Sequence, residues 1–291
     1  MYCLPLADDC GISASNVEAI ALCLDAGALR GASIMASGDA AAKAAEDLGR
    51  RLAANPTLRA GAHLNLLEGR CTADPKSIPL LADGSGFFRH SLGTLCRTLY
   101  TMRNRDKHIL IHQVSLEWHA QIDAIHTALK TATGWDTVPL YLDGHQHVHA
   151  IPALRPALGD VLGSVPVIHV RVPEEPRYRC PAPPVLFAAG TLRRELLAFW
   201  GRSLRKFLSR RRVPAPDYFI GAFCSGNMTL ERLAAGLAAI AGRGPDDAVV
   251  EIMTHPGVAP RHLTPVGASR KEAVFARFYA APERETERRM L

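Results

Sequence analysis

No apolar run in the sequence approaches the roughly 18 residues that a membrane-spanning helix needs. Cys-x-x-Cys pairs are also absent. The seven cysteines are scattered, and an odd, dispersed set is typical of free thiols in a reducing compartment rather than of a disulfide framework. The opening residues, Met1 to Ala7, have neither the basic region nor the length of a secretory signal. Together these absences predict a cytoplasmic protein.

Two common functional signatures are missing as well. No glycine-rich phosphate loop follows the first predicted strand, which argues against nucleotide binding. No Gly-x-Ser-x-Gly elbow is present, which argues against a serine hydrolase. What remains is a chain of 291 residues, 48% hydrophobic and 21% charged, a composition typical of a globular protein and not of a disordered one.

Short apolar strands alternate with helices about seven times along the chain. We expect strands near residues 2–7, 32–36, 58–66, 138–142, 165–172, 218–223 and 248–253. We expect helices near residues 16–28, 39–54, 113–133, 152–162, 229–241 and 269–280, followed by a loosely ordered polar tail from Pro282. This alternation predicts a parallel α/β fold, a distorted or incomplete TIM-like (β/α) barrel with inserted loops, formed by a single domain over residues 1–291.

Two insertions are expected within this barrel. Residues 67–112 are predicted to be an irregular loop, and loops of this length are often functional. Residues 173–217 combine a proline-rich stretch with a basic amphipathic helix. Ser13 or Ser15 is expected to cap the first helix, and Asp39 the second, because their side-chain oxygens accept main-chain N–H groups at helix starts.

Three histidines alternate in the segment that follows the fourth predicted strand, from Asp143 to His149. Residues two apart point the same way in an extended backbone, so His145, His147 and His149 are expected to converge on one side with Asp143. Parallel sheets and barrels carry their chemistry at the carboxyl ends of strands. Imidazole is a common metal ligand, so this cluster predicts a metal or catalytic role rather than an ordinary turn.

Ionisable side chains also follow three other predicted strands: Asp8 and Asp9 the first, His63 the third and His255 the seventh. Unpaired charges are rarely buried, so their gathering at one barrel mouth suggests a metal. A divalent ion held by one carboxylate and two imidazoles polarises a carbonyl and activates water. A nearby aspartate accepts the proton and a histidine donates one. A metal ion, a general base and a general acid together are suited to the hydrolysis of an amide.

These strand ends carry four motifs that resemble, in the same order, those of the YdjC-like carbohydrate deacetylases, a family with chitooligosaccharide and hopanoid-biosynthesis branches. The matching motifs are Ala7-Asp8-Asp9-Cys10-Gly11-Ile12-Ser13, Gly61-Ala62-His63-Leu64-Asn65-Leu66-Leu67-Glu68-Gly69, Asp143-Gly144-His145-Gln146-His147-Val148-His149 with Pro152, and Thr254-His255-Pro256-Gly257. The resemblance spans residues 7–257 and implies a distorted TIM-like barrel. It also implies metal-dependent removal of acetyl from an N-acetylated amino sugar.

The resemblance further implies a role for each matched residue. The metal ligands would be Asp9, His63 and His145, around one divalent ion. Asp8 would be the general base, and His255 the general acid or an oxyanion partner. His147 and His149 would contact either the metal ligands or the substrate, and the substrate would also be bound by Asn65, Glu68 and Asp143. Two imidazoles favour zinc over magnesium, which prefers oxygen ligands, although the family is associated with either ion. The family usually carries an aromatic residue where Cys10 stands, and a homodimer is plausible by resemblance only.

The net charge of +6 is concentrated in residues 191–213, where eight arginines and lysines face Glu195 alone, a local charge of +7 (8 minus 1). At 100° per residue one broad face is apolar, made by Leu192, Leu196, Phe199, Trp200, Leu204, Phe207 and Leu208. Either this face packs on the barrel, or the helix lies peripherally on an anionic membrane, at its inner face, and presents a lipid-linked sugar. Nucleic-acid binding is not expected, because no recognition module accompanies the charge.

Two other functional interpretations remain open. One is a different metal-dependent hydrolase on a TIM-like barrel, such as an amidohydrolase or a phosphoesterase. Amidohydrolases typically begin with His-x-His at the first strand, and here that place holds Asp8 and Asp9, which argues against them. The other is a non-catalytic barrel that binds a glycan or a membrane.

Overall fold

The structure, a computed structural model, describes residues 1–179, 184–257 and 281–291. At its centre lies one sheet of seven parallel strands in the order β5-β4-β3-β2-β1-β7-β6. The strands are β1 (Tyr2–Cys10), β2 (Gly31–Ile34), β3 (Arg59–Leu64), β4 (Leu140–Gly144), β5 (Val167–Val170), β6 (Tyr218–Ile220) and β7 (Val249–Thr254). Each confirms a strand predicted from the sequence. The sheet curls into a half-barrel with β5 and β6 at its edges, so the predicted incomplete barrel is confirmed.

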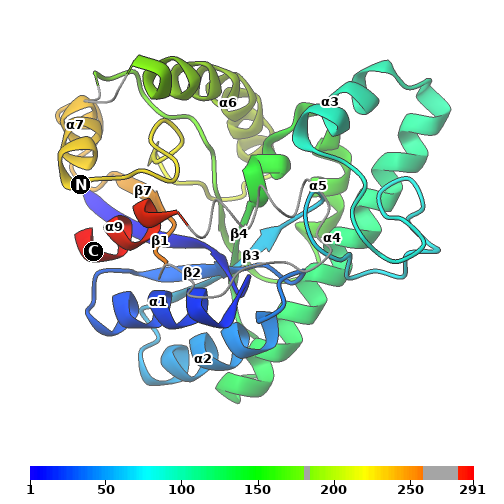
Figure 1. The fold of residues 1–291 in the computed structure, drawn as a ribbon, viewed down its shortest axis with the longest axis horizontal. Coiled ribbons are helices and arrows are strands. Elements are labelled where there is room, and N and C mark those ends of the chain that lie inside the picture. The colour runs from blue at the N-terminus through cyan, green and yellow to red at the C-terminus, as the bar shows by residue number, and fades with distance from the viewer. Residues whose placement is uncertain (180–183, 258–280) are drawn as a thin grey trace.

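Helices surround this sheet (Figure 1). The first two, α1 (Ala14–Asp25) and α2 (Ala41–Ala54), cover one side, and α6 (Pro184–Arg210) and α7 (Leu230–Ile240) lie on the opposite side. After the short 3-10 helix η2 (Pro152–Leu154) comes α5 (Arg155–Val161), which packs against α4 (Asn104–Thr133). The largest cluster of buried apolar side chains joins the sheet to α1, α2, α4, α5 and α6, which fixes the strand ends relative to one another.

Main-chain and side-chain hydrogen bonds set where the first two helices begin. The Ser13 hydroxyl accepts the N–H of Asn16 at 3.2 Å, so one of the two predicted caps of α1 is confirmed. The prediction that Asp39 caps α2 is wrong, because the helix begins after Ala40. The turn before α2 is held by the main chain instead, since the Ala40 N–H donates to the Gly11 carbonyl at 2.8 Å.

The segment 67–112 is more regular than predicted. It contains α3 (Leu92–Thr101) and the first turns of α4 (Asn104–Thr133), which begins nine residues before the predicted start near residue 113. The loop before α3 is fixed by Glu117 of α4, a buried carboxylate that accepts two main-chain N–H groups of the loop at 2.9 Å each. An ordered loop beside the strand ends is therefore part of the fold.

Helix α6 begins inside the stretch that was expected to be irregular, and it divides the predicted apolar face in two. A buried stripe consists of Trp200, Leu204 and Leu208. The exposed stripe of α6 consists of Leu192, Leu196 and Phe199, with 74% of Leu192 and 61% of Phe199 open to solvent. The prediction of one broad face is therefore wrong in part. Among the helices that the structure describes, none combines the length and apolar character needed to cross a membrane.

The C-terminal residues form α9 (Pro282–Met290), so the prediction of a loosely ordered tail is wrong. Two charged side chains of this helix, Arg284 and Glu287, are buried. Because charged side chains usually stay in solvent, the sequence of this segment favoured an exposed tail. The helix predicted at 269–280 lies outside the described residues.

Candidate active site

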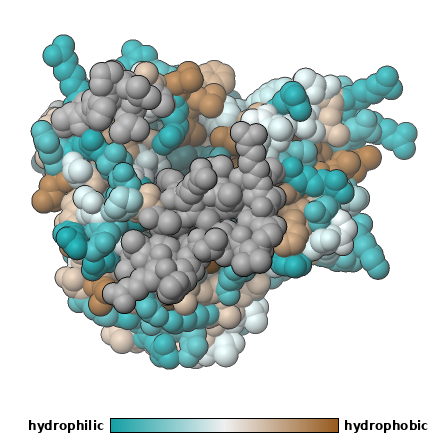
Figure 2. Space-filling view, in the orientation of Figure 1, coloured by the Kyte–Doolittle hydropathy of each residue, from teal (hydrophilic) through white to brown (hydrophobic). Residues whose placement is uncertain are grey.

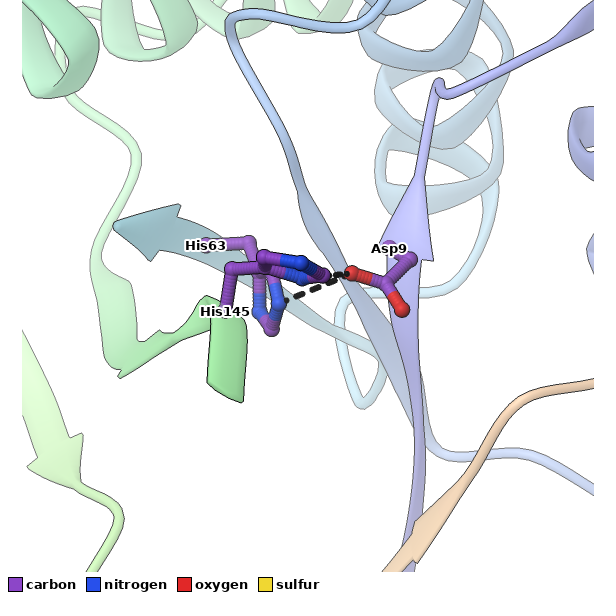
Figure 3. Close-up of side chains that lie close together, drawn as sticks. All are labelled: Asp9, His63 and His145. Atoms are coloured by element: carbon purple, nitrogen blue, oxygen red, sulfur yellow. Dashed lines mark hydrogen bonds and ion pairs between the residues drawn. The ribbon is translucent and has the colours of Figure 1, made fainter. Parts of the chain in front are cut away.

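The rings of His63 and His145 face the same carboxylate oxygen of Asp9 at the carboxyl ends of the strands (Figure 3). Its Oδ1 is 3.0 Å from His63 Nε2 and 2.9 Å from His145 Nδ1. One donor atom from each of the three residues lies within 4.8 Å of the others, and all three side chains are buried. The structure thus brings together the three residues predicted to be metal ligands.

The backbone bends to place these side chains. Asp9, near the end of β1, has a φ angle of 60°, in the left-handed region that a residue with a side chain rarely adopts. His63 comes from β3, and His145 directly follows β4. Strained backbone of this kind is concentrated at functional sites, where the surrounding structure over-determines it.

The carboxylate of Asp143 orients the His63 ring. Asp143 is its register partner on the neighbouring strand, and the Asp143 Oδ1 accepts a hydrogen bond from His63 Nδ1 at 2.8 Å. The Asp143 Oδ2 accepts from the Ser33 hydroxyl at 2.9 Å and lies 3.0 Å from Arg171 Nη1. Because Nδ1 is engaged by Asp143, Nε2 is the ring nitrogen that faces Asp9 and that His63 would offer to a metal ion, which is the arrangement that metal-binding histidines use.

The donor set fits a transition metal. Two imidazole nitrogens and one carboxylate oxygen converge, and one imidazole is already oriented by a carboxylate behind it. Magnesium prefers oxygen ligands and retains its waters, so this set suits zinc better. The structure also forms a second acidic group from Asp8, His63 and Asp143, but Arg171 occupies its two carboxylates.

The charges of the site are strongly coupled. Burial opposes the ionisation of Asp9, yet the neighbouring His145 and His63 hold its pKa well below the usual range. Burial likewise disfavours the charged form of His63, but Asp143 and Asp9 raise its pKa well above the usual value. The pKa of His145 is raised to about 9, because Asp9 and Glu68 outweigh its burial. The field of this cluster therefore favours positive charge beside the Asp9 carboxylate.

Asp8 lies in the buried interior and binds a different partner from Asp9. Arg171 binds it bidentately, with Nη1 2.6 Å from Oδ2 and Nη2 2.7 Å from Oδ1. Burial raises the pKa of Asp8 to about 7, and Arg171 opposes that rise. The two adjacent aspartates thus occupy different environments, as expected for neighbours on a strand.

Two charged residues of this interior were not predicted from the sequence. Arg171 directly follows β5 and is fully buried, and its Nε donates to Glu251 of β7, which is also fully buried. Each interrupts an apolar strand pattern, Val170-Arg171-Val172 and Val250-Glu251-Ile252. A buried charge needs a partner of opposite sign. One basic and one acidic residue within apolar strand sequences therefore indicate a buried ion pair between Arg171 and Glu251.

His255 follows β7 and closes the other side of the site. Its Nε2 lies 3.7 Å from Asp9 Oδ2, and its side chain is buried. Burial lowers the pKa of His255 to about 3, with Asp9 opposing and Arg284 reinforcing the shift. The imidazole is therefore neutral near pH 7 and carries one N–H that can donate a hydrogen bond.

The three alternating histidines do not lie in an extended segment, so that prediction is wrong. The chain turns after Gly144 into a 3-10 helix, η1 (His145–Ala150), with Gln146 and His147 at φ angles of 49° and 58°. A Cβ at Gly144 would lie 2.9 Å from the Leu64 carbonyl oxygen, so a side chain there would crowd the neighbouring strand. The bend itself lies at Gln146 and His147, where the φ angles are positive.

Of these three histidines, only His145 reaches Asp9 among the contacts of the described residues. The His147 ring lies edge-on to Phe219, with ring centres 5.7 Å apart. The His149 Nε2 donates to the Arg171 carbonyl at 3.0 Å. Burial lowers the pKa of both, to about 4 for His149, so neither is charged at neutral pH.

Among the other residues expected near substrate, Asn65, His149 and Asp143 are fully buried and do not reach the surface in this structure. The Asn65 side chain holds the loop after β3, accepting the Leu67 N–H at 3.0 Å. Glu68 is different, because 17% of its side chain is exposed while its Oε2 accepts from His145 Nε2 at 3.0 Å. Glu68 therefore links a predicted ligand to the surface.

Comparisons with known proteins find relatives over most of the chain. A relative in Mus musculus, described as a carbohydrate deacetylase, is 29% identical over 259 residues, which cover 86% of this chain and 76% of that protein. A Danio rerio relative with the same description is 26% identical over 269 residues, covering 86% and 80%.

A crystal structure from Enterococcus faecalis, described as a candidate cellobiose-phosphate cleavage protein, superposes with a TM-score of 0.65 at 19% identity. It covers 100% of this chain and 90% of that one, and at this identity the likeness shows the fold alone. The family model for YdjC-like proteins matches residues 6–291, nearly the whole chain. The chain therefore belongs to the family of YdjC-like proteins.

Proposed function

We propose that this protein is a metal-dependent hydrolase that removes the N-acetyl group from an amino sugar of an oligosaccharide or of a lipid-linked glycan. The observation that carries the proposal is the buried carboxylate of Asp9, which contacts two imidazoles through one oxygen and lies 3.7 Å from His255 Nε2 through the other. Support for a carbohydrate substrate comes from the relatives described as carbohydrate deacetylases.

Asp9, His63 and His145 would hold one divalent ion, with zinc favoured over magnesium by the two imidazoles. Such an ion would polarise the amide carbonyl and lower the pKa of a water molecule. Asp143 keeps the His63 ring in the orientation that presents Nε2, and Glu68 does the same for His145 from the other side. These contacts act on the ligands and not on the substrate.

Asp8 is the proposed general base. Arg171 fixes the orientation of its carboxylate, and a general base works best when its pKa lies near the working pH. The pKa of about 7 for Asp8 fulfils that condition. Arg171 is itself held by Glu251, so the base is placed by a chain of buried ion pairs.

His255 is the proposed partner of the acetyl group. A neutral imidazole donates its N–H to the carbonyl oxygen, on which negative charge develops as water attacks. The leaving amine nitrogen must gain a proton before the C–N bond breaks. The proton that Asp8 takes from water balances that gain, so His255 can stay neutral and keep its hydrogen bond to the carbonyl oxygen.

Acetate release tests this proposal. EDTA-treated protein would be incubated with N,N′-diacetylchitobiose, N-acetylglucosamine or an N-acetylglucosaminyl lipid, each with zinc, magnesium, manganese or cobalt added back. We expect metal-dependent acetate from at least one substrate. His145→Ala should abolish it, and His108→Ala, a change of an exposed histidine on α4, should not. Phosphate release from a sugar phosphate without acetate would favour a phosphoesterase, and binding without any product would favour a non-catalytic barrel.

We also propose that the protein contacts an anionic membrane through the exposed stripe of α6. Figure 2 shows a hydrophobic patch at the upper edge of the molecule, where Figure 1 places α6, among hydrophilic side chains. The same helix continues into exposed Arg202, Lys206 and Arg210, so apolar and basic side chains share its outer surface. A peripheral protein at the inner membrane face would use both.

Co-sedimentation with phosphatidylglycerol vesicles at low salt tests the membrane contact. The variant Leu192→Ser/Leu196→Ser/Phe199→Ser should partition less than the wild type, whereas equal partitioning would rule the contact out. Light scattering would test the homodimer that the family resemblance predicts, and a monomer mass would exclude it.

A further inference from the structure

Glu287 of α9 is a fully enclosed carboxylate close to the end of the chain, with 1% of its surface exposed. Its Oε2 accepts the main-chain N–H of His255 at 2.6 Å, and its Oε1 accepts the main-chain N–H of Met228 at 2.9 Å. A buried carboxylate is costly unless several donors satisfy it, and hydrogen bonds to an ionised group are among the strongest in proteins. Glu287 therefore holds the loops after β6 and β7 together.

The same carboxylate lies beside the His255 ring. The Glu287 Oε2 is 4.0 Å from His255 Nδ1, while the opposite ring nitrogen, Nε2, is 3.7 Å from Asp9 Oδ2. The imidazole is therefore placed between two carboxylates, one from α9 and one from the proposed metal site. Movement of the His255 main chain would displace Nε2 relative to Asp9.

A second contact fixes the same segment to α9. The Gly257 N–H donates to the Arg284 carbonyl at 3.1 Å. A Cβ at Gly257 would lie 2.8 Å from the Arg284 Cβ, a distance that real Cβ atoms essentially never show, so only glycine allows the helix to approach this closely. The Thr254–Gly257 motif therefore contacts α9 at two residues, His255 and Gly257.

We propose that Glu287 is a positioning residue for His255, so that the C-terminal helix completes the active site. The inference rests on the proposed function, because it assigns Glu287 a role through the residue that faces the acetyl group. Glu287 is not proposed to touch substrate. Its effect comes from holding the His255 main chain, and a misplacement of about 1 Å at a catalytic group is enough to lower a rate on the order of a hundredfold.

Three variants of the full-length, zinc-loaded protein test this role. Glu287→Gln keeps the size of the side chain but replaces one acceptor oxygen with an N–H₂ donor, so it cannot accept both main-chain N–H groups. Glu287→Asp keeps both acceptors on a shorter stem. Glu285→Gln makes the same neutralising change on the same helix, where the carboxylate pairs with Arg289 at the surface, and serves as the matched control.

For N,N′-diacetylchitobiose, we expect Glu287→Gln to lower kcat roughly ten- to a hundredfold with KM changed less than about twofold. Bound zinc and the folded fraction at the assay temperature should match the wild type. Glu287→Asp should recover part of kcat, and Glu285→Gln should equal the wild type. An unchanged kcat in Glu287→Gln, or a loss of kcat that only parallels a loss of folded protein, would overturn the inference.

A second readout keeps this inference separate from the proposed function. The ring signals of His255, assigned by NMR in zinc-loaded protein, should shift or broaden in Glu287→Gln and stay unchanged in Glu285→Gln. If the wild type releases no acetate, the proposed function fails, but the NMR comparison still decides whether Glu287 positions His255. Identical His255 signals in the wild type and Glu287→Gln would contradict the positioning role even in an active enzyme.

Discussion

Replacing Asp143 with asparagine changes one atom in the buried network behind His63, and the consequences follow from its contacts. One carboxylate oxygen accepts from His63 Nδ1 at 2.8 Å, and the other faces the Ser33 hydroxyl and Arg171 Nη1 at 2.9 and 3.0 Å. An asparagine that keeps its oxygen toward His63 points an N–H₂ group at the Arg171 guanidinium, so two donors meet. The opposite orientation points the N–H₂ at His63 Nδ1.

The second orientation changes the tautomer of His63. The ring would then accept at Nδ1 and carry its proton on Nε2, the nitrogen that faces Asp9, and a protonated nitrogen cannot bind a metal. Loss of a carboxylate behind a metal-binding histidine typically weakens metal affinity ten- to a hundredfold, or about 1.4–2.7 kcal/mol. We expect Asp143→Asn to weaken zinc binding within that range.

Zinc titration against a competing chelator measures this change, with circular dichroism to confirm folding. Ser33→Ala is the matched control, because it removes the hydroxyl that donates to Asp143 Oδ2 and lies 3.1 Å from His63 Nδ1, and it leaves the carboxylate on His63 in place. We expect less than a threefold change for the control. An unchanged zinc affinity in folded Asp143→Asn would show that Asp143 does not orient a ligand, and the assignment of His63 would then be wrong.

Three further predictions concern stability. Arg171→Met leaves three buried carboxylates without their cation. It should lower the free energy of unfolding, measured by urea titration, by about 3–5 kcal/mol. The double variant Arg171→Met/Glu251→Gln should recover part of that loss, because one of the three carboxylates is then neutral. Gly61→Ala places a Cβ 2.5 Å from the buried Tyr141 ring and should lower the free energy of unfolding by about 1–3 kcal/mol. Gly93→Ala in α3, where the space is open, should stabilise the protein slightly. Equal changes of melting temperature in the two variants would contradict this prediction. Removal of metal with EDTA should lower the melting temperature, because an ion present at a thousandfold its Kd stabilises the fold by about 4 kcal/mol.

Much of the fold could be predicted because its signals are local. Each strand is a short apolar run between turn residues, and the alternation with helices specifies a parallel sheet. The positions of Asp9, His63 and His145 followed from one rule, that parallel strands end at the same edge. The tertiary contacts that decide where an element begins or ends cannot be read from the sequence. The start of α2 is an example, because a main-chain hydrogen bond from Ala40 to Gly11 sets it and Asp39 does not.

The errors at the site have two physical causes. Alternation of His145, His147 and His149 predicted a shared face only if the backbone stayed extended, and the positive φ angles of Gln146 and His147 end the extended conformation there. The second cause is the burial of a charged side chain, Glu287, in the C-terminal helix. Glu287 was assigned to a loose tail because a charged residue is normally exposed, and its main-chain partners lie far away in sequence.

The central claim is that one divalent ion, held by Asp9, His63 and His145, is required to hydrolyse an acetamido sugar. Its most direct test is acetate release from the active substrate of the panel, measured as zinc is added stepwise to EDTA-treated protein. We predict that the rate rises in proportion to zinc and reaches a plateau at one ion per chain, and that His63→Ala remains inactive throughout. Full activity before any zinc is added, or a plateau reached equally by His63→Ala, would contradict the claim.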